Sequence, residues 1–259
     1  MTTQVRVFSD IHLEFAPFDP QSGDVLVLAG DICTAHALKK QNQQGRMFLD
    51  FFQRCVDNYN KVFYVAGNHE HYHHDFDKTI QVLKENVPEG ITVLENEVVH
   101  HNGWDFVGST LWTDFGRGNA LAMLHCQNMM NDYNCIRRGS KGYRKLLARD
   151  IYEIHVQSIN KLEEIFDACG PKVFMISHHG PSYRCISPGY RDSTVNSAYA
   201  SFLDDWISRY PQIKHWVSGH THRSHSFVND NCQFSSNPRG YWPLDPNPDF
   251  KLDFTIALN

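Results

Sequence analysis

The chain has 259 residues, 41% apolar and 20% charged, which is typical of a folded protein with one large α/β domain or two small ones. Its formal net charge is −5 and it shows no basic stripe, so we expect no long nucleic acid as a partner. We predict a cytoplasmic protein with no membrane partner, because its seven cysteines lack C-x-x-C spacing, its amino terminus lacks an apolar signal-peptide core, and no apolar run reaches the ~18–20 residues that span a bilayer.

Six short apolar runs, rich in β-branched and aromatic residues, each stop at a polar cluster and predict buried strands. In chain order they occupy residues 5–10, 24–31, 61–68, 104–110, 172–179 and 215–222. Three longer stretches carry apolar residues at helical spacing and predict helices over residues 45–60, 149–169 and 195–210. Because strands alternate with helices, we expect a layered α/β fold.

Three segments have a different pattern. Residues 91–110 predict closely spaced strands, as in a hairpin or meander, and residues 231–259 predict strands between turns rich in Pro, Asn and Asp. Residues 113–147 fit neither a strand nor a helix pattern and predict an inserted, lid-like excursion. Since no repeat and no low-complexity linker divides the chain, we expect a single domain over residues 1–259.

The ends of five predicted strands carry carboxylates, an amide and imidazoles. These residues are Asp10, His12, Asp31, Asn68, His69, His178, His179, His220 and His222. Ligands of α/β sheets bind at the carboxyl ends of the strands, so we expect these side chains to meet at one edge. In an extended segment residues i and i+2 lie on the same side, so Asp10 with His12, and His220 with His222, can act as pairs.

The composition of this set indicates a metal centre. Imidazole suits borderline divalent metals, whereas carboxylate and amide oxygens suit harder ones. Two Asp, one Asn and four of the six His are more ligands than one tetrahedral ion needs, so the set predicts two ions that share a bridging carboxylate. Two metals ~3.5–4 Å apart are typical of in-line displacement at phosphorus, with a metal-bound hydroxide as the nucleophile.

In order, the motifs D-x-H, G-D, G-N-H-E, H-H and G-H-T-H resemble the calcineurin-like metallophosphoesterase superfamily. They are Asp10-Ile11-His12, Gly30-Asp31, Gly67-Asn68-His69-Glu70, His178-His179 and Gly219-His220-Thr221-His222. The motifs span residues 10–222, which is most of the chain. The resemblance implies a four-layer α/β fold, in which a two-sheet β-sandwich is flanked by helices and the metals lie at the sheet edge.

The resemblance also implies a role for each residue. One metal is expected on Asp10, His12 and His222, and the other on Asn68, His178 and His220, with Asp31 as the bridge. Family members use pairs of manganese, iron, zinc or nickel ions; we favour manganese, although the sequence does not select the metal. His69 is expected to be the catalytic residue, which stabilises the phosphoryl oxygens or protonates the leaving oxygen.

Several neighbouring residues depart from the family pattern or lie outside it. The protein phosphatase branch carries a second acid and an Arg after the bridging Asp, but here Thr34 replaces that acid and no Arg is near. The usual acid that orients His69 is therefore missing at that position, and Asp75 is a candidate for this role. The departure also makes protein phosphatase activity a disfavoured hypothesis. His179 is expected to support a ligand or contact the substrate. Three histidines outside the motif are expected in an exposed loop or at the pocket rim: His71, His73 and His74.

The leading hypothesis is a dinuclear metal-dependent phosphohydrolase that cleaves a small phosphoester, such as a phosphodiester or a nucleotide. A nuclease on the same scaffold and a non-catalytic metal-binding scaffold that docks partners are the alternatives. We expect the excursion 113–147 to form part of the substrate pocket, with Arg137 and Arg138 gripping phosphate. A surface excursion whose arginines meet only water fits the pattern equally well. The natural substrate, the ester type and the oligomeric state are left open.

Overall fold

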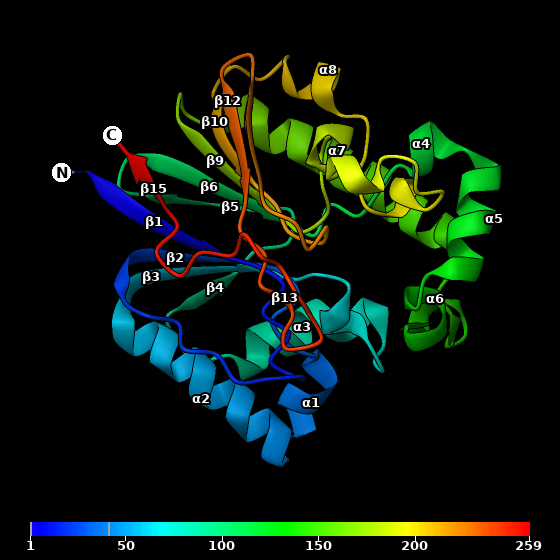
Figure 1. Ribbon diagram of the computed structural model, residues 1–259, viewed down its shortest axis with the longest axis horizontal. Coiled ribbons are helices and arrows are strands. Elements are labelled where there is room, and N and C mark those ends of the chain that lie inside the picture. The colour runs from blue at the N-terminus through cyan, green and yellow to red at the C-terminus, as the bar shows by residue number, and fades with distance from the viewer. Residues whose placement is uncertain (1, 41) are drawn as a thin grey trace.

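The computed structural model describes residues 2–40 and 42–259, and two stacked β-sheets form its centre (Figure 1). The first sheet has the strand order β15-β1-β2-β3-β4. Its strands are β1 (Thr3–Phe8), β2 (Gly23–Ala29), β3 (Tyr59–Val65), β4 (Ile91–Val93) and β15 (Thr255–Leu258). Strands β1 to β4 run parallel, whereas β15 is antiparallel to β1.

The second sheet has the strand order β11-β12-β10-β9-β6-β5. Its strands are β5 (Glu97–His101), β6 (Trp104–Ser109), β9 (Val173–Ser177), β10 (Ile213–Val217), β11 (His225–Asn229) and β12 (Cys232–Ser236). The middle strands β6, β9, β10 and β12 are parallel, and antiparallel hairpins close both edges. All six predicted strands are confirmed, as are the hairpin in residues 91–110 and the strands of the carboxyl-terminal segment.

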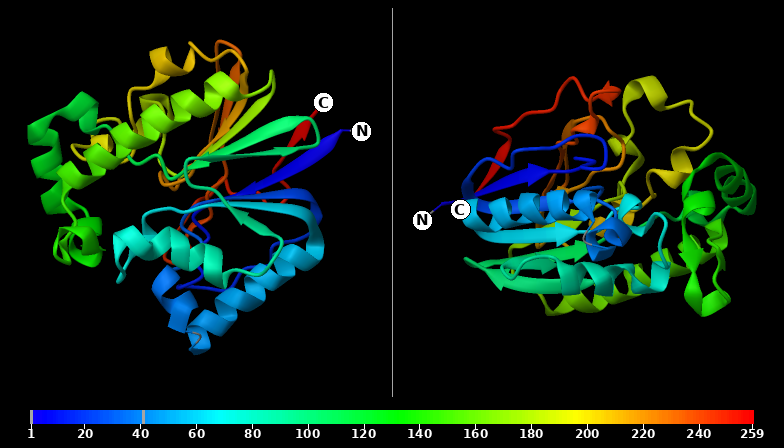
Figure 2. Two further views of the ribbon diagram at one scale, coloured as in Figure 1. Left: turned by 180° about the vertical axis from the view of Figure 1, so that it is seen from behind. Right: turned by 90° about the horizontal axis from the view of Figure 1, so that it is seen from below.

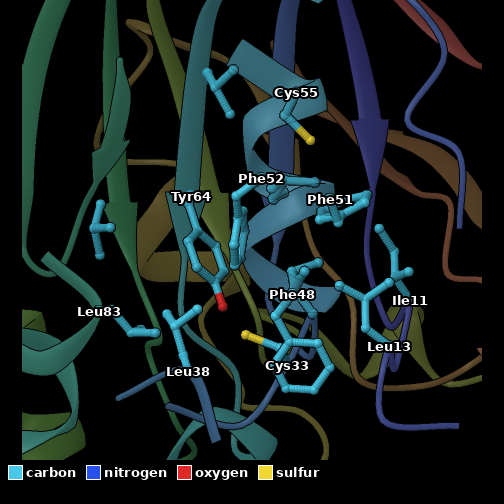
Figure 3. Close-up of a cluster of buried hydrophobic side chains, with 14 of the residues drawn as sticks. Ile11, Leu13, Cys33, Leu38, Phe48, Phe51, Phe52, Cys55, Tyr64 and Leu83 are labelled. Carbon is cyan, nitrogen blue, oxygen red and sulfur yellow. The ribbon is translucent and has the colours of Figure 1, made fainter. Parts of the chain in front are cut away.

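Helices cover the outer face of each sheet, which completes four layers (Figures 1 and 2). Helices α1 (Ala35–Lys40), α2 (Gln43–Asn58) and α3 (Phe76–Asn86) lie on the first sheet, and α7 (Ala148–Ala168) and α8 (Asp204–Ile207) lie on the second. Helix α2 begins where the Asn42 side chain accepts a hydrogen bond of 2.9 Å from the Gly45 amide. Its apolar stripe, Phe48, Phe51, Phe52 and Cys55, faces the sheet (Figure 3). The predicted helices at 45–60 and 149–169 and the four-layer fold are confirmed.

Both faces of the central strands are buried, which explains why these strands are continuous apolar runs. In β2, Val25 and Val27 point into the space between the sheets, whereas Leu26 and Leu28 pack against the helices. Between the sheets, the ring of Phe63 stacks on a ring of the opposite sheet, that of Phe106, with centroids 4.4 Å apart. This core fixes the position of the two sheets relative to each other, and it therefore also fixes the loops at their edge.

The excursion is more regular than the sequence predicted. It contains α4 (Phe115–Gly118), α5 (Ala120–Met129), α6 (Asp132–Cys135) and the paired short strands β7 (Arg137–Arg138) and β8 (Arg144–Lys145). Helix α5 shows no amphipathic period because Leu121 and Leu124 are exposed while Cys126 is buried. Its start is fixed by Asn119, whose side chain accepts hydrogen bonds from two amides of the first turn. The excursion lies on the side of the sheets away from both termini (Figure 1).

The predicted helix over residues 195–210 is wrong. Only a 3₁₀ turn, η5 (Asn196–Ala198), and the single-turn α8 form there. The intervening backbone pairs with a neighbouring loop instead of its own preceding turn, since Ser201 donates to the Gly180 carbonyl at 2.9 Å. The remaining short elements are η1 (His69–His71), η2 (Gly139–Lys141), η3 (Tyr183–Cys185), η4 (Pro188–Tyr190), β13 (Gly240–Tyr241) and β14 (Asp245–Pro246). Within residues 2–40 and 42–259, none of the helices combines the length and hydrophobicity that a bilayer-spanning segment needs.

Candidate metal centre and active site

The predicted site residues follow the carboxyl ends of β1, β2, β3, β9 and β10, where the loops turn sharply. Five of them adopt left-handed backbone conformations, with positive φ of 49–68°. They are Asp10, His12, Asp31, His220 and His222. The expectation that the i and i+2 pairs lie in extended segments is therefore wrong, since both members of each pair have left-handed and not extended backbone. Non-glycine residues in this region are uncommon, and they concentrate at functional sites.

The glycines of the motifs allow the loops to pack this closely. A Cβ atom on Gly30 would lie 2.2 Å from His178 Nδ1, and one on Gly67 would lie 2.2 Å from Asp31 Oδ1. Any side chain at these two positions would therefore displace a predicted ligand. This gives a physical reason for the glycine that precedes the polar residue in the G-D and G-N-H-E motifs.

Ligand-type atoms gather in three groups, and within each the ligand atoms lie within 4.8 Å of one another. The first group is Asp10, His12, Asp31 and His222, and the second, which shares Asp31 with it, is Asp31, His178 and His220. The third is His12, Glu14 and His69, so His69 lies next to the first group. The remaining predicted ligand, Asn68, places its Oδ1 3.1 Å from His178 Nε2. The structure thus brings all seven predicted ligands together and puts Asp31 between the two halves.

The chemistry of this set fits divalent metal ions. His220 is buried, its Nε2 has no hydrogen-bond partner in the described part of the chain, and burial lowers its pKa, which keeps the imidazole neutral as a ligand must be. His12 Nε2 and His222 Nε2 face each other at 3.1 Å. Burial opposes a charge on His178, yet Asp31 raises its pKa to about 10, so the surroundings stabilise positive charge at this point.

Surrounding groups orient the predicted ligands. His178 Nδ1 donates to the Ala29 carbonyl at 3.0 Å, which turns Nε2 toward the centre. The Asn68 amide nitrogen donates to buried Asp132 at 2.8 Å, which turns Oδ1 the same way. Tyr72 also donates to Asp132, at 2.7 Å. Asp132 comes from α6, so the excursion supports a predicted ligand that follows a strand of the first sheet, and no pattern in the sequence predicts this contact.

Glu70, the last residue of the G-N-H-E motif, is a fully buried connector. Its carboxylate accepts hydrogen bonds from backbone amides of two loops and from one hydroxyl: Asp31, Ile32, Cys33, Gly67 and Tyr64. Burial and the nearby Asp31 carboxylate raise the pKa of Glu70 to about 7. These bonds tie the loop after β2 to the loop after β3. Glu70 therefore fixes the distance between Asp31 and the residues that precede Glu70 in its own motif, Asn68 and His69.

His69 is held by an acid that the sequence interpretation missed. Its Nδ1 donates to Glu14 at 2.8 Å, and its Nε2 lies 3.3 Å from the Tyr241 hydroxyl. Burial opposes a charge on His69, but Asp31 and Glu14 raise its pKa to about 9. The candidate Asp75 is wrong, because it caps α3 and accepts from the Gly139 amide at 2.8 Å. The available signal was position: Glu14 follows His12 at the same spacing at which His12 follows Asp10.

The other histidines of this loop differ from one another. His73 is exposed and His74 is half-buried. His71 was expected in an exposed loop or at the pocket rim but is buried, with its ring stacked on Phe76 at 4.4 Å and close to Trp112 at 5.6 Å. The turn η1 points it inward, so it packs against α3 and against Trp112, which directly precedes the excursion.

A cavity of about 410 Å³ opens beside the predicted ligands, and Asp31, Asn68, His220 and His222 line it. The excursion contributes Met129, Met130 and Asn131 to its wall. Neither Arg137 nor Arg138 is among the described residues that line it. Arg138 instead lies 3.5 Å from Asp77 and 3.7 Å from Asp150, so its guanidinium faces these acids and not the cavity.

His179 lies behind the cavity wall. It is buried, and its Nδ1 donates to the Thr110 carbonyl at 3.2 Å. Its ring packs against His220 with centroids 4.2 Å apart, and against Trp112 at 4.8 Å. Of the two roles considered for it, this position favours support of a ligand over contact with the substrate.

Comparisons with known proteins agree with this geometry. The model of the calcineurin-like phosphoesterase family matches residues 4–224. Uncharacterized protein L509 of Acanthamoeba polyphaga mimivirus is 26% identical over 269 residues, which cover 92% of this chain and 91% of the viral protein. The phosphopantetheinyl hydrolase of Mycobacterium tuberculosis has a similar structure, with a TM-score of 0.66, 18% identity, and coverage of 92% of this chain and 90% of the hydrolase. GAP50, the anchor in the inner membrane complex of Plasmodium, has a TM-score of 0.51 and 11% identity, with coverage of 99% and 78%. At these identities the two solved structures show a shared fold.

Proposed function

The chain belongs to the calcineurin-like phosphoesterase family, and on this premise we propose that it is a single-domain, dinuclear metal-dependent hydrolase of small phosphoesters. The observation that carries the proposal is the position of Asp31, whose carboxylate belongs to two of the groups of ligand atoms and so links the predicted ligands of both ions. Two divalent ions held there would supply Lewis-acid activation of water and neutralisation of charge at phosphorus. We favour manganese, because the set mixes carboxylate and amide oxygens with imidazole.

We assign the two halves of the site to separate ions. Asp10, His12 and His222 would hold one ion; Asn68, His178 and His220 would hold the other. The distances between these side chains support this division, since His12 Nε2 and His222 Nε2 are 3.1 Å apart and His178 Nε2 and Asn68 Oδ1 are also 3.1 Å apart.

We propose that His69 is the catalytic residue. Its Nδ1 proton is held by Glu14, which leaves Nε2 as the nitrogen that can exchange a proton or a hydrogen bond with a reacting group. That nitrogen faces Tyr241, which lines the cavity. At this position His69 can stabilise a phosphoryl oxygen or donate a proton to the leaving oxygen.

The size and charge of the cavity support a small substrate over long nucleic acid. Among the described lining residues the only guanidinium or ammonium group is that of Arg223, and acids line the cavity as well. A nuclease would need a basic path for the flanking phosphates.

The experiment is elemental analysis of the manganese-loaded protein, followed by hydrolysis of 4-nitrophenyl phosphate and bis(4-nitrophenyl) phosphate. We expect a stoichiometry near two ions per chain and manganese-dependent release of 4-nitrophenol. His69→Ala should keep the metal content and reduce turnover by about 10²–10⁴-fold, the usual scale of general acid–base catalysis. Two bound ions with no hydrolysis of either ester would instead favour the docking-scaffold alternative, and a saturated value near one ion would overturn the dinuclear site.

A further inference from the structure

The cavity is larger than a phosphoryl group requires. Its volume of about 410 Å³ lies within the ~300–1,000 Å³ range of small-molecule sites. Four predicted ligands, Asp31, Asn68, His220 and His222, form part of its wall, and most of the other wall residues come from the excursion and from residues 186–199 and 241–245. Space for an organic group is therefore present next to the position expected for phosphorus.

About half of the residues in these other walls are aromatic or apolar, and the others are polar. We call the aromatic and apolar part the tyrosine compartment, defined by Tyr190, Tyr199, Tyr241, Met130, Ile186 and Val195. The ring of Tyr199 stacks on His220 with centroids 4.6 Å apart, and the ring of Tyr241 meets His222 at 4.3 Å. The compartment thus begins directly at the predicted ligands. Aromatic faces and a thioether suit a flat or apolar group, and their hydroxyl edges tolerate a few polar atoms on it.

The charge of the walls disfavours a strongly anionic group. Apart from the two imidazoles, the only basic side chain among the described lining residues is Arg223. Its guanidinium is already engaged, because it donates to the His222 carbonyl at 2.8 Å and to the Tyr190 hydroxyl at 3.2 Å, and it lies 3.4 Å from Asp245. A second phosphate or a carboxylate in the compartment would meet Asp245 without an unshared cation.

We infer that the tyrosine compartment binds the uncharged aromatic or apolar group of the phosphoester substrate, and that it selects against substrates with further anionic groups. This inference rests on the proposed function, since it places the phosphoryl group at the metal centre. It goes beyond that function because it names the chemical class of the rest of the substrate.

Binding of non-hydrolysable phosphonates tests the compartment separately from hydrolysis. The probes are methylphosphonate, phenylphosphonate and 4-phosphonobenzoate, titrated into the manganese-loaded protein by calorimetry. Burial of the ring should make phenylphosphonate bind at least about 10-fold more tightly than methylphosphonate. The added carboxylate of 4-phosphonobenzoate should remove most of that gain, because no unshared cation meets it. Equal affinities for the methyl and phenyl probes, or tightest binding of the carboxylate probe, would overturn the inference.

Two variants locate the effect. Met130→Ala and Val195→Ala each remove apolar surface from the compartment, so each should lower the ratio of phenyl to methyl affinity by about threefold or more. The matched control is Leu124→Ala, an exposed position of α5 that does not line the cavity and should keep the wild-type ratio. A ratio unchanged in both compartment variants would contradict the inference. Failure of the proposed function has a different signature: the phosphonates would bind with the expected ratio while no ester is hydrolysed.

Discussion

Replacing Glu14 by Gln tests whether this residue positions His69. The two side chains are joined by a hydrogen bond of 2.8 Å and are only 9% and 12% exposed, so the contact is shielded from water. Burial alone would raise the pKa of Glu14, but its hydrogen bonds from His12 and His69 lower it to about 2, which identifies the charged carboxylate as the partner. Glutamine keeps the shape and an acceptor oxygen and removes the charge.

The size of the effect follows from this bond. A hydrogen bond with a charged partner contributes about 1.5–3 kcal/mol, and about 1.36 kcal/mol corresponds to a tenfold change in rate. We therefore expect Glu14→Gln to lower kcat by about 10- to 150-fold. Because Glu14 also lies 3.2 Å from His12 Nδ1, the affinity for metal should fall as well, so kcat is measured at saturating manganese with the metal content checked by elemental analysis.

A double-mutant cycle decides the mechanism. If Glu14 acts through His69, then Glu14→Gln combined with His69→Ala should be no slower than His69→Ala alone. If the two losses multiply instead, Glu14 acts independently of His69, and the positioning role is refuted. A loss that disappears at saturating manganese would assign Glu14 to His12 alone. The control is Glu89→Gln, an exposed glutamate remote in sequence from the motif residues, which should leave kcat unchanged.

Three further predictions concern the metal centre and stability. Asp31→Asn should weaken both metal sites together, whereas His12→Ala should mainly empty one; metal titration distinguishes these outcomes, and selective loss of one ion in Asp31→Asn would contradict the bridge. Asp132→Ala should lower the affinity of one ion by about 10–100-fold, since Asn68 loses the acceptor that orients its amide, and Asp132→Asn should lose less; equal affinity in all three proteins would remove this role. Burial raises the pKa of Glu95 to about 7, whereas the ordinary value is 4.5. Between these pH values the folded chain keeps a proton that the unfolded chain has released, so the stability of the wild type falls as the pH rises from 4.5 to 7. The difference in unfolding temperature between Glu95→Gln and the wild type should therefore shift by a few degrees in favour of the variant from pH 4.5 to 7, and it should stay constant above pH 7. A difference that does not change with pH would refute the assignment.

The sequence was sufficient to predict an element wherever the type and the spacing of its residues determine its structure. Runs buried on both faces, such as β2, and the stripe of α2 were recognised because their periods are those of a strand and a helix. Motif order was sufficient to bring Asp10 and His222 together, although the backbone at both is left-handed and not extended as expected. The excursion helix α5 was not predicted because its apolar residues lie on all sides of the helix, so its sequence has no amphipathic periodicity.

Contacts between loops that are far apart in the chain could not be predicted from the sequence, and two of them orient residues of the candidate site. Glu14 reaches His69, and Asp132 reaches Asn68, across 55 and 64 positions of the chain. No local pattern marks either acid, because each is recognised only by what it faces once the sheets have stacked. Asp132 has a further consequence. It directly follows Asn131, which with Met130 forms part of the cavity wall, so one short segment both orients a predicted ligand and shapes the substrate space. An insertion in this excursion that changed the substrate would also disturb the metal centre, unless the link between Asp132 and Asn68 were kept.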